Sequence, residues 1–423
     1  MSFRKKLLLS FTIVLFSATA AEKGSSDLLL KAAREGEVIS QLKVADQYFF
    51  GKKGRRVNLS LAAYWFRKAA DAGNARGQFN YGVCCLKGWG VPASPQTGFL
   101  WISKAAAQQL EEALIMQAEL LFRGLAAEDD PAHRFPAMSA DVDKSLDILR
   151  KLVSQGNISA AKSLARLLLS DPVLRGKNAT ELRNCAMISA KNMPRDVECV
   201  LIYTTVLQNG IGGSTDTRQA VNLLHSIEDI SPEAMARLSE IYEYGFSVPQ
   251  DREKSLDLCR RAAKLGSPRA QFAMGTRHLE GNMVEHAPEK AFMFFKQSMQ
   301  NGYPAAAAAL GKCLLDGIGT EKNAEKAFEL FMQGAVSGDP EAQYRLGRCF
   351  LDGTGTARDF SGAAHWFRSA ANSGHTDAER ELGIVMLEGK GMEINKVEGI
   401  RLLKTAAAKG DIQAIRYLNG EKI

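Results

Sequence analysis

The sequence predicts an all-α protein: an α/α superhelical solenoid of about ten 36-residue helix-turn-helix repeats, with a capping half-repeat at each end. Two series of glycines, each returning every 36 residues, are the first observation: Gly245, Gly281, Gly317, Gly353 and Gly389, then Gly266, Gly302, Gly338, Gly374 and Gly410. The second observation is that small and bulky side chains recur at the same interval. A single globular core does not need such regularity, whereas a stack of similar two-helix units repeats the same two turns.

Residues 339–374 show how one repeat is built. Asp339 is a good helix N-cap, and Pro340 suits the first helical position because its missing N–H costs nothing there. The first helix is predicted to end near Leu351, and Gly353 suits a left-handed residue just after it. A second helix is predicted over about 359–372.

Matching columns of side chains predict how the two helices pack. The first helix carries a column of small residues, Gly275, Gly311, Gly347 and Gly383. The second helix carries a bulky column that includes Phe295, Phe331 and Phe367. Glycine within a helix costs roughly 1 kcal/mol relative to alanine, so its recurrence predicts close packing. A Phe at these positions is expected to be buried.

The repeat 339–374 resembles the Sel1-like repeat, a relative of the tetratricopeptide repeat with a slightly longer period. The resemblance is carried by DPEAQYRLGRCFLDGTGT and, further on, AHWFRSAANSG. It implies a right-handed superhelix of antiparallel helix pairs that serves as a scaffold for protein contacts. Some Cys-rich relatives that bind or cleave β-lactams have a cysteine pair in each repeat. This sequence lacks that pairing, so the resemblance does not extend to that activity.

Residues 1–20 have the layout of a secretory signal peptide. A basic start at 4–6 precedes the apolar run 7–16, and Ala18-Thr-Ala20 fits a cleavage site. The run is about half of the ~20 apolar residues that a membrane span needs, and no later stretch is long enough. We therefore expect an exported protein without a membrane span after cleavage, periplasmic or extracellular, with the endoplasmic reticulum lumen as the alternative.

The predicted organisation of the remaining chain is a succession of five segments. They are an N-terminal capping helix at 21–36, clear repeats at 37–123, degenerate repeats with an insertion at 124–230, regular repeats at 231–410, and a C-terminal capping helix at 411–423. The insertion lies mainly at 124–140. The weak middle allows either one continuous superhelix, bent or hinged there, or two separate stacks.

The sequence predicts no catalytic, cofactor or metal site. The Gly-x-Gly pairs at 317–319 and 353–355 join helix to helix and lack the lysine of a phosphate-binding loop. His278, Glu280, Glu285 and His286 cluster, but His278 falls in a packing column and the other three in a turn. The seven cysteines are interpreted as small apolar fillers rather than a disulfide framework. The formal net charge of +7 is too weak a bias to predict nucleic-acid binding.

The candidate contact surface is the helix face opposite the packing columns. A helical wheel places Glu341, Arg345 and Arg348 there, with Arg269 and Lys312 on the same face in earlier repeats. This face is either simply solvated or lines a groove for a protein or peptide partner. The first function hypothesis is a non-enzymatic exported scaffold. The alternatives are a cell-envelope hydrolase or carbohydrate-binding protein with a site near 124–230, and an adaptor of the endoplasmic reticulum lumen. The sequence specifies neither the partner nor the oligomeric state.

Overall fold

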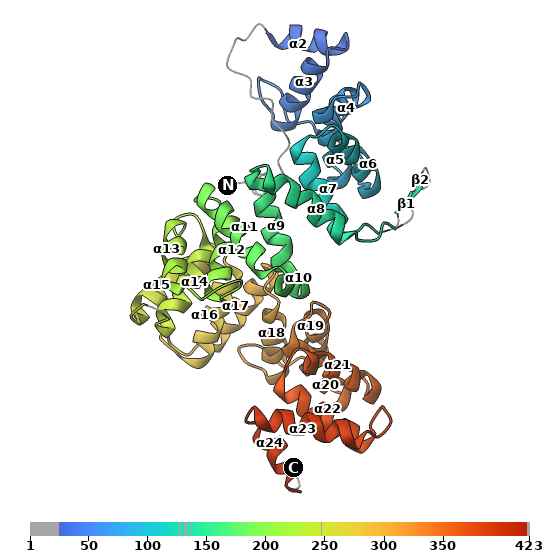
Figure 1. Cartoon of the computed structure of the whole chain (residues 1–423). Helices are drawn as coiled ribbons and strands as arrows, with labels where there is room; N and C mark the ends of the chain where they lie inside the picture. Colours follow the sequence, from blue (N-terminus) through green and yellow to red (C-terminus); the bar gives the residue numbers. More distant parts are fainter. Residues whose placement is uncertain (1–24, 127, 131–132, 136, 247, 421–423) are drawn as a thin grey trace. The chain divides into compact units, whose positions relative to one another are not determined.

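The computed structural model describes residues 25–126, 128–130, 133–135, 137–246 and 248–420, and almost all of their regular structure is helical (Figure 1). The predicted all-α helical-repeat fold is confirmed. The helices form two compact units, Met1–Asp216 and Thr217–Ile423, whose boundary lies inside the segment predicted to be degenerate. The predicted signal peptide at 1–20 lies outside the described residues.

Among the described residues of the first unit, the lone helix α2 precedes four helix pairs, and the lone helix α12 follows them. The elements are α2 (Ser25–Arg34), α3 (Val38–Phe50), α4 (Leu59–Asp71), α5 (Ala75–Lys87), α6 (Pro95–Ala107), α7 (Glu111–Arg123), β1 (Glu128–Asp130), β2 (His133–Phe135), α8 (Val142–Ser154), α9 (Ile158–Ser170), α10 (Pro172–Lys177), α11 (Ala179–Asn192) and α12 (Val197–Gln208). The pair α9 and α11 is interrupted by the short helix α10. It begins at the Asp171 N-cap, whose carboxylate accepts the Val173 and Leu174 N–H groups.

In the second unit, five helix pairs lie between two lone helices, α13 and α24. The elements are α13 (Thr217–Ser226), α14 (Pro232–Tyr244), α15 (Arg252–Lys264), α16 (Pro268–Glu280), α17 (Pro288–Gln300), α18 (Ala305–Asp316), α19 (Ala324–Val336), α20 (Pro340–Asp352), α21 (Phe360–Asn372), α22 (Thr376–Glu388), α23 (Lys396–Ala408) and α24 (Ile412–Leu418). The first helix of each pair is called helix A below and the second helix B.

A small β-hairpin is an addition that the all-α prediction did not include. Strands β1 and β2 pair antiparallel, with Glu128 opposite Phe135. At its base, Leu125 and Met138 exchange two backbone hydrogen bonds of 2.9 Å. The buried Gln96 on α6 donates its Nε2–H to the Ala126 carbonyl at 2.9 Å, which ties the hairpin base to the helices. The hairpin therefore occupies the insertion predicted at 124–140.

The glycine column of helix A packs against the phenylalanine column of helix B. Phe367 is fully buried, and a Cβ added to Gly347 would lie 2.6 Å from its ring. The same relation holds between Gly311 and Phe331, at 2.5 Å. The mid-helix glycines are thus explained by the close approach of an aromatic ring to the helix A backbone.

The second glycine of each Gly-x-Gly loop contacts the preceding repeat. A Cβ on Gly355 would lie 2.2 Å from the carbonyl oxygen of Ala324, the first residue of helix B in the repeat before. The same contact with a carbonyl oxygen recurs at 2.1–2.4 Å between Gly90 and Leu59, Gly212 and Ala179, Gly319 and Pro288, and Gly391 and Phe360. These loops therefore pack one repeat against the next.

Buried amides form a further link between repeats. Gln271 and Gln343, in the same column of helix A, donate to the carbonyls of Ala263 and Ala335 in the preceding repeat, both at 3.3 Å. Asn301, at the end of helix B, donates to Gln271 Oε1 at 2.8 Å. The matching position after Gln343 is Ser373, and Gln343 Oε1 is buried with no hydrogen-bond partner among the described residues.

All seven cysteines are buried, as expected of small apolar fillers, and each carries a free thiol in the structure. Burial raises the pKa of Cys313 and of Cys349 to about 11. Both thiols are therefore protonated at neutral pH.

Candidate partner-binding surface

The predicted contact residues lie on the A helices of the second unit, where charged side chains of successive repeats meet. This surface is called the A face. It comprises Glu233, Arg237, Glu240, Arg269, Lys312, Glu341, Arg345, Arg348, Asp377 and Glu381. Helix A exposes these side chains because its opposite side carries the alanine, leucine and glycine columns that pack on helix B.

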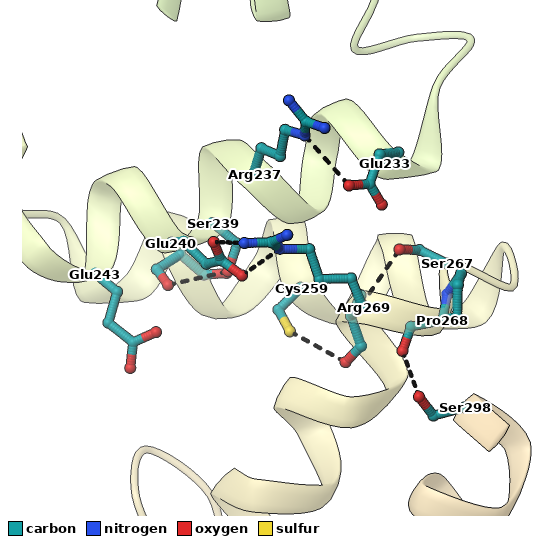
Figure 2. Close-up of polar contacts among 12 residues, drawn as sticks. Glu233, Arg237, Ser239, Glu240, Glu243, Cys259, Ser267, Pro268, Arg269 and Ser298 are labelled. Carbon is teal, nitrogen blue, oxygen red and sulfur yellow. Dashed lines mark hydrogen bonds and ion pairs between the residues drawn. The ribbon is translucent and has the colours of Figure 1, made fainter. Parts of the chain in front are cut away.

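The first cluster of the A face joins α14 to α16 (Figure 2). Arg269 donates Nε–H and Nη2–H to the two carboxylate oxygens of Glu240, at 2.6 and 2.7 Å. This bidentate bond raises the pKa of Arg269. Ser267 and Pro268 fix the start of α16, because Ser267 caps it and Pro268 occupies its first turn. Arg269 is therefore the second residue of α16, and its side chain reaches back to α14 of the previous repeat.

A buried charge supports this junction from the interior. Arg277 is only 4% exposed and pairs with Glu243 at 2.6 Å. Its Nη1 lies 2.7 Å from Cys259 Sγ, and its Nη2 lies 3.2 Å from Ser255 Oγ. Since both Arg277 and Cys259 are buried, these contacts stabilise the packing of α14, α15 and α16.

The second cluster joins α20 to α22. Glu341 pairs with Arg345 at 2.5 Å in its own helix and with His375 Nε2 at 2.9 Å in the next repeat. The hydrogen bond from His375 lowers the pKa of Glu341 to about 2. His375 also caps α22, because its Nδ1 accepts the Ala378 N–H, and its ring stacks on Tyr344 with centroids 4.8 Å apart.

Further along the A face, Arg348 bridges the same two repeats. It contacts Asp352 in its own helix at 2.9 Å and Glu381 on α22 at 3.2 Å. Arg380, 7% exposed, continues the row by pairing with Asp411, the N-cap of α24, at 2.6 Å. By contrast, Lys312 on α18 is exposed and forms no ion pair with any described residue.

The structure therefore brings together some predicted contact residues but not all five. Glu341 and Arg345 touch, Arg348 shares their helix, and Arg269 and Lys312 lie on separate helices. The first unit contains a charged cluster on α7, α9 and the start of α12 that the sequence analysis missed: Glu119, Lys162, Arg166, Asp196 and Glu198. The 36-residue spacing could not reveal it, because the insertion and α10 displace these residues from the register.

A second feature is a groove between helices of two neighbouring repeats. It has a volume of about 400 Å³ and is lined by Arg260, Ala263 and Lys264 on α15, Gln271 and Met274 on α16, and Phe294 and Gln297 on α17. An adjoining recess of about 250 Å³ shares Phe294 and Gln297 and adds Lys290 and Met293. Sequence analysis placed Phe295, the residue after Phe294, in a packing column but did not foresee this opening.

Within the described residues, no group of three or more His, Cys, Asp or Glu side chains could hold a metal ion. His278 lies on the packing side, as predicted, with its ring stacked on Phe294 at 5.7 Å and Nδ1 3.1 Å from the Glu285 carbonyl. No described helix is long and apolar enough to span a membrane. The described residues at 124–230 also show no feature that favours a hydrolytic or carbohydrate-binding site.

Comparison with known proteins identifies the repeat. A family model described as Sel1 repeat matches residues 38–74, 75–110, 206–226, 232–267, 268–303, 304–338, 340–375 and 376–411, more than half of the chain. The matches leave out 111–205, where the structure nevertheless contains the paired helices α7 and α8, then α9 and α11. A search of the curated proteins finds no match.

Several solved structures resemble this one at low identity. A protective antigen of uropathogenic Escherichia coli, c5321, with an SLR fold, is 25% identical over 93% of this chain and 89% of its own, with a TM-score of 0.49. A Sel1 repeat protein from Oxalobacter formigenes is 21% identical over 58% of this chain and 96% of its own, with a TM-score of 0.48. The human IFIT1 dimer with PPP-AAAA is 12% identical over 94% of this chain and 93% of its own, with a TM-score of 0.46. The repeat assignment depends on the sequence matches alone.

Proposed function

Because this chain belongs to the Sel1 repeat family, we propose that it is a non-enzymatic, exported scaffold that holds a protein or peptide partner on its A face. Sel1 repeats commonly form protein-interaction scaffolds, so the class of function follows from the family. The observation that supports the choice of surface is the set of ion pairs that join α14 to α16 and α20 to α22.

Those ion pairs favour binding because they preorganise the surface. Arg269 reaches Glu240, and Arg348 reaches Glu381, each across a repeat boundary. Side chains already held in one geometry lose less conformational entropy when a partner contacts them. Arg269 and Glu240 are 38% and 36% exposed and Arg348 is 43% exposed, so these groups remain available for further hydrogen bonds.

Photo-crosslinking in the native compartment tests the proposal. A photoreactive phenylalanine analogue replaces Lys312, which is exposed on helix A and has no ion-pair partner to lose among the described residues. The matched control carries the same group at Lys326, exposed on helix B of the same repeat. We expect a discrete protein adduct from position 312 and none from 326. Adducts at 326 alone would refute the A face as the contact surface.

Export has its own test. The apolar run and cleavage pattern at 1–20 support secretion, and cleavage near Ala21 gives a mature chain that begins there. Intact-mass measurement of the protein from its native host should show that truncation. A mass equal to that of the full chain would contradict export by this route.

A further inference from the structure

We infer that the groove between α15, α16 and α17 is a second docking site, which binds an acidic peptide segment of a partner protein with one bulky apolar anchor. This inference rests on the proposed function, since it names a partner chemistry for a scaffold. It concerns a different surface, however, because two of the groove's walls are B helices.

The charge of the groove is the first argument. Three cations line the groove and its adjoining recess, Arg260, Lys264 and Lys290, and no acidic side chain does. All three are exposed, and none forms an ion pair with a described residue. On the A face, by contrast, the arginines are already paired with carboxylates of this chain. The groove therefore offers free positive charge, which favours carboxylates of a partner.

The apolar floor is the second argument. Met274 is buried beneath the groove, Phe294 is half-buried, and Met293 in the adjoining recess is 58% exposed. Methionine adapts its shape to different apolar partners, and a half-buried aromatic ring provides a large contact area. These side chains suit one bulky apolar residue, placed between flanking acids that reach Lys264 and Lys290.

An exposed amide completes the site. Gln297 lines both the groove and the recess. The buried Gln271 beside it uses both ends of its amide within this chain, on Ala263 and Asn301. Gln297 makes no side-chain hydrogen bond with a described residue, so it presents a donor and an acceptor to a peptide backbone.

This combination does not recur at the neighbouring junctions. The position of Lys264 is taken by Glu228 one repeat earlier and by Gln300 one repeat later. The position of Met293 is taken by Asp257 and by Glu329, respectively. Among these three junctions, cationic and apolar character thus coincide only at the groove. A requirement of the helical fold alone would have produced similar residues at each junction.

The test measures peptide binding by fluorescence anisotropy with the full chain. The probe is the labelled hexapeptide EDLFED, compared with EDGSED, which lacks the apolar anchor, and KKLFKK, which reverses the charge. We expect EDLFED to bind at least tenfold more tightly than either. Absence of EDLFED binding, or equal binding of EDGSED or KKLFKK, would overturn the inference.

Two variants locate the site. Arg260→Gln with Lys264→Gln removes two exposed groove charges, and Met293→Glu introduces a residue type that the same column already tolerates at Glu329. Each should weaken EDLFED binding at least tenfold. The control, Lys326→Gln with Lys404→Gln, removes two exposed charges outside the groove and should change affinity less than twofold. Equal losses in control and groove variants would refute a localised site.

Two further binding measurements test whether the groove prefers another polyanion to an acidic peptide. Phosphatidylglycerol vesicles and an oligo-dT strand are tested against the same proteins. If either binds more tightly than EDLFED and is insensitive to Met293→Glu, the groove is an anion site for that class and the peptide inference fails. The scaffold proposal still holds after such a result if the crosslinker at position 312 yields a protein adduct. Failure of the peptide inference can therefore be distinguished from failure of the scaffold proposal.

Discussion

Replacing Gly355 by alanine tests whether the loop glycines hold the repeats together. Gly355 has a φ of +71° and meets the Ala324 carbonyl, whereas Gly338 has a φ of +87° and a Cβ added there would meet nothing within 4 Å. Both substitutions therefore carry the left-handed strain of a non-glycine residue, roughly 1–2 kcal/mol. Only Gly355→Ala adds a steric conflict between two repeats.

The size of that conflict follows from the distances. The new Cβ would lie 2.2 Å from the Ala324 oxygen, where ordinary contact begins at 3.4 Å, so the loop and helix α19 must separate by about 1 Å. The neighbour is backbone at the start of a helix and cannot rotate away. Overpacking of this kind typically costs about 1–3 kcal/mol. Gly355→Ala should therefore be less stable than Gly338→Ala by that amount.

Urea denaturation followed by circular dichroism gives the free energies of unfolding. Because repeat proteins can unfold in parts, hydrogen exchange of α19 and the 353–359 loop is measured as well. We expect faster exchange there in Gly355→Ala only. If the two variants agree within about 0.5 kcal/mol and exchange alike, the loop glycine does not govern the repeat junction.

Four other substitutions probe the fold and its charges. Phe367→Ala should cost about 3–5 kcal/mol in urea denaturation, because the ring is fully buried over Gly347; a cost below about 1.5 kcal/mol would contradict this packing. Glu341 has a folded pKa of about 2 against an ordinary 4.5, so its contribution is complete above pH 4.5 and is lost as pH falls towards 2. Urea midpoints should therefore show that Glu341→Gln is less stable than wild type at pH 7 and converges with it near pH 2; a constant difference would exclude the ionised pair as its cause. Ser373→Asn should raise the free energy of unfolding by about 1 kcal/mol, because the new amide can donate to Gln343 Oε1 as Asn301 donates to Gln271. Asn301→Ser should lower the free energy of unfolding by a similar amount. No change in either variant would rule out this hydrogen bond as a source of stability.

Periodicity predicted the architecture where local turn chemistry is intact. Gly353 and Gly374 mark two turns that the chain must make, so the helices around them followed directly from spacing. In the degenerate segment 124–230, Gly212 keeps the contact with Ala179, but most of the other recurring glycines are missing. The extra helix α10 and the hairpin therefore had no periodic signal.

The candidate surfaces were predictable only in part. A helical wheel indicates that Arg348 faces away from the core, but its partner Glu381 depends on how adjacent A helices are offset. The groove is harder to predict from the sequence, because it combines residues from three helices of two repeats. Its one sequence signal was the coincidence of Arg260, Lys264 and Lys290 at a single junction.

The buried thiols can be used to detect partial unfolding of this protein. They are spread over α5, α11, α12, α15, α18 and α20, so both units contain several. A maleimide reagent can alkylate each sulfur only when the surrounding helices part, and mass spectrometry can time each event separately. Without any engineered label, the order of alkylation would show which repeats come apart first and whether a bound peptide closes them.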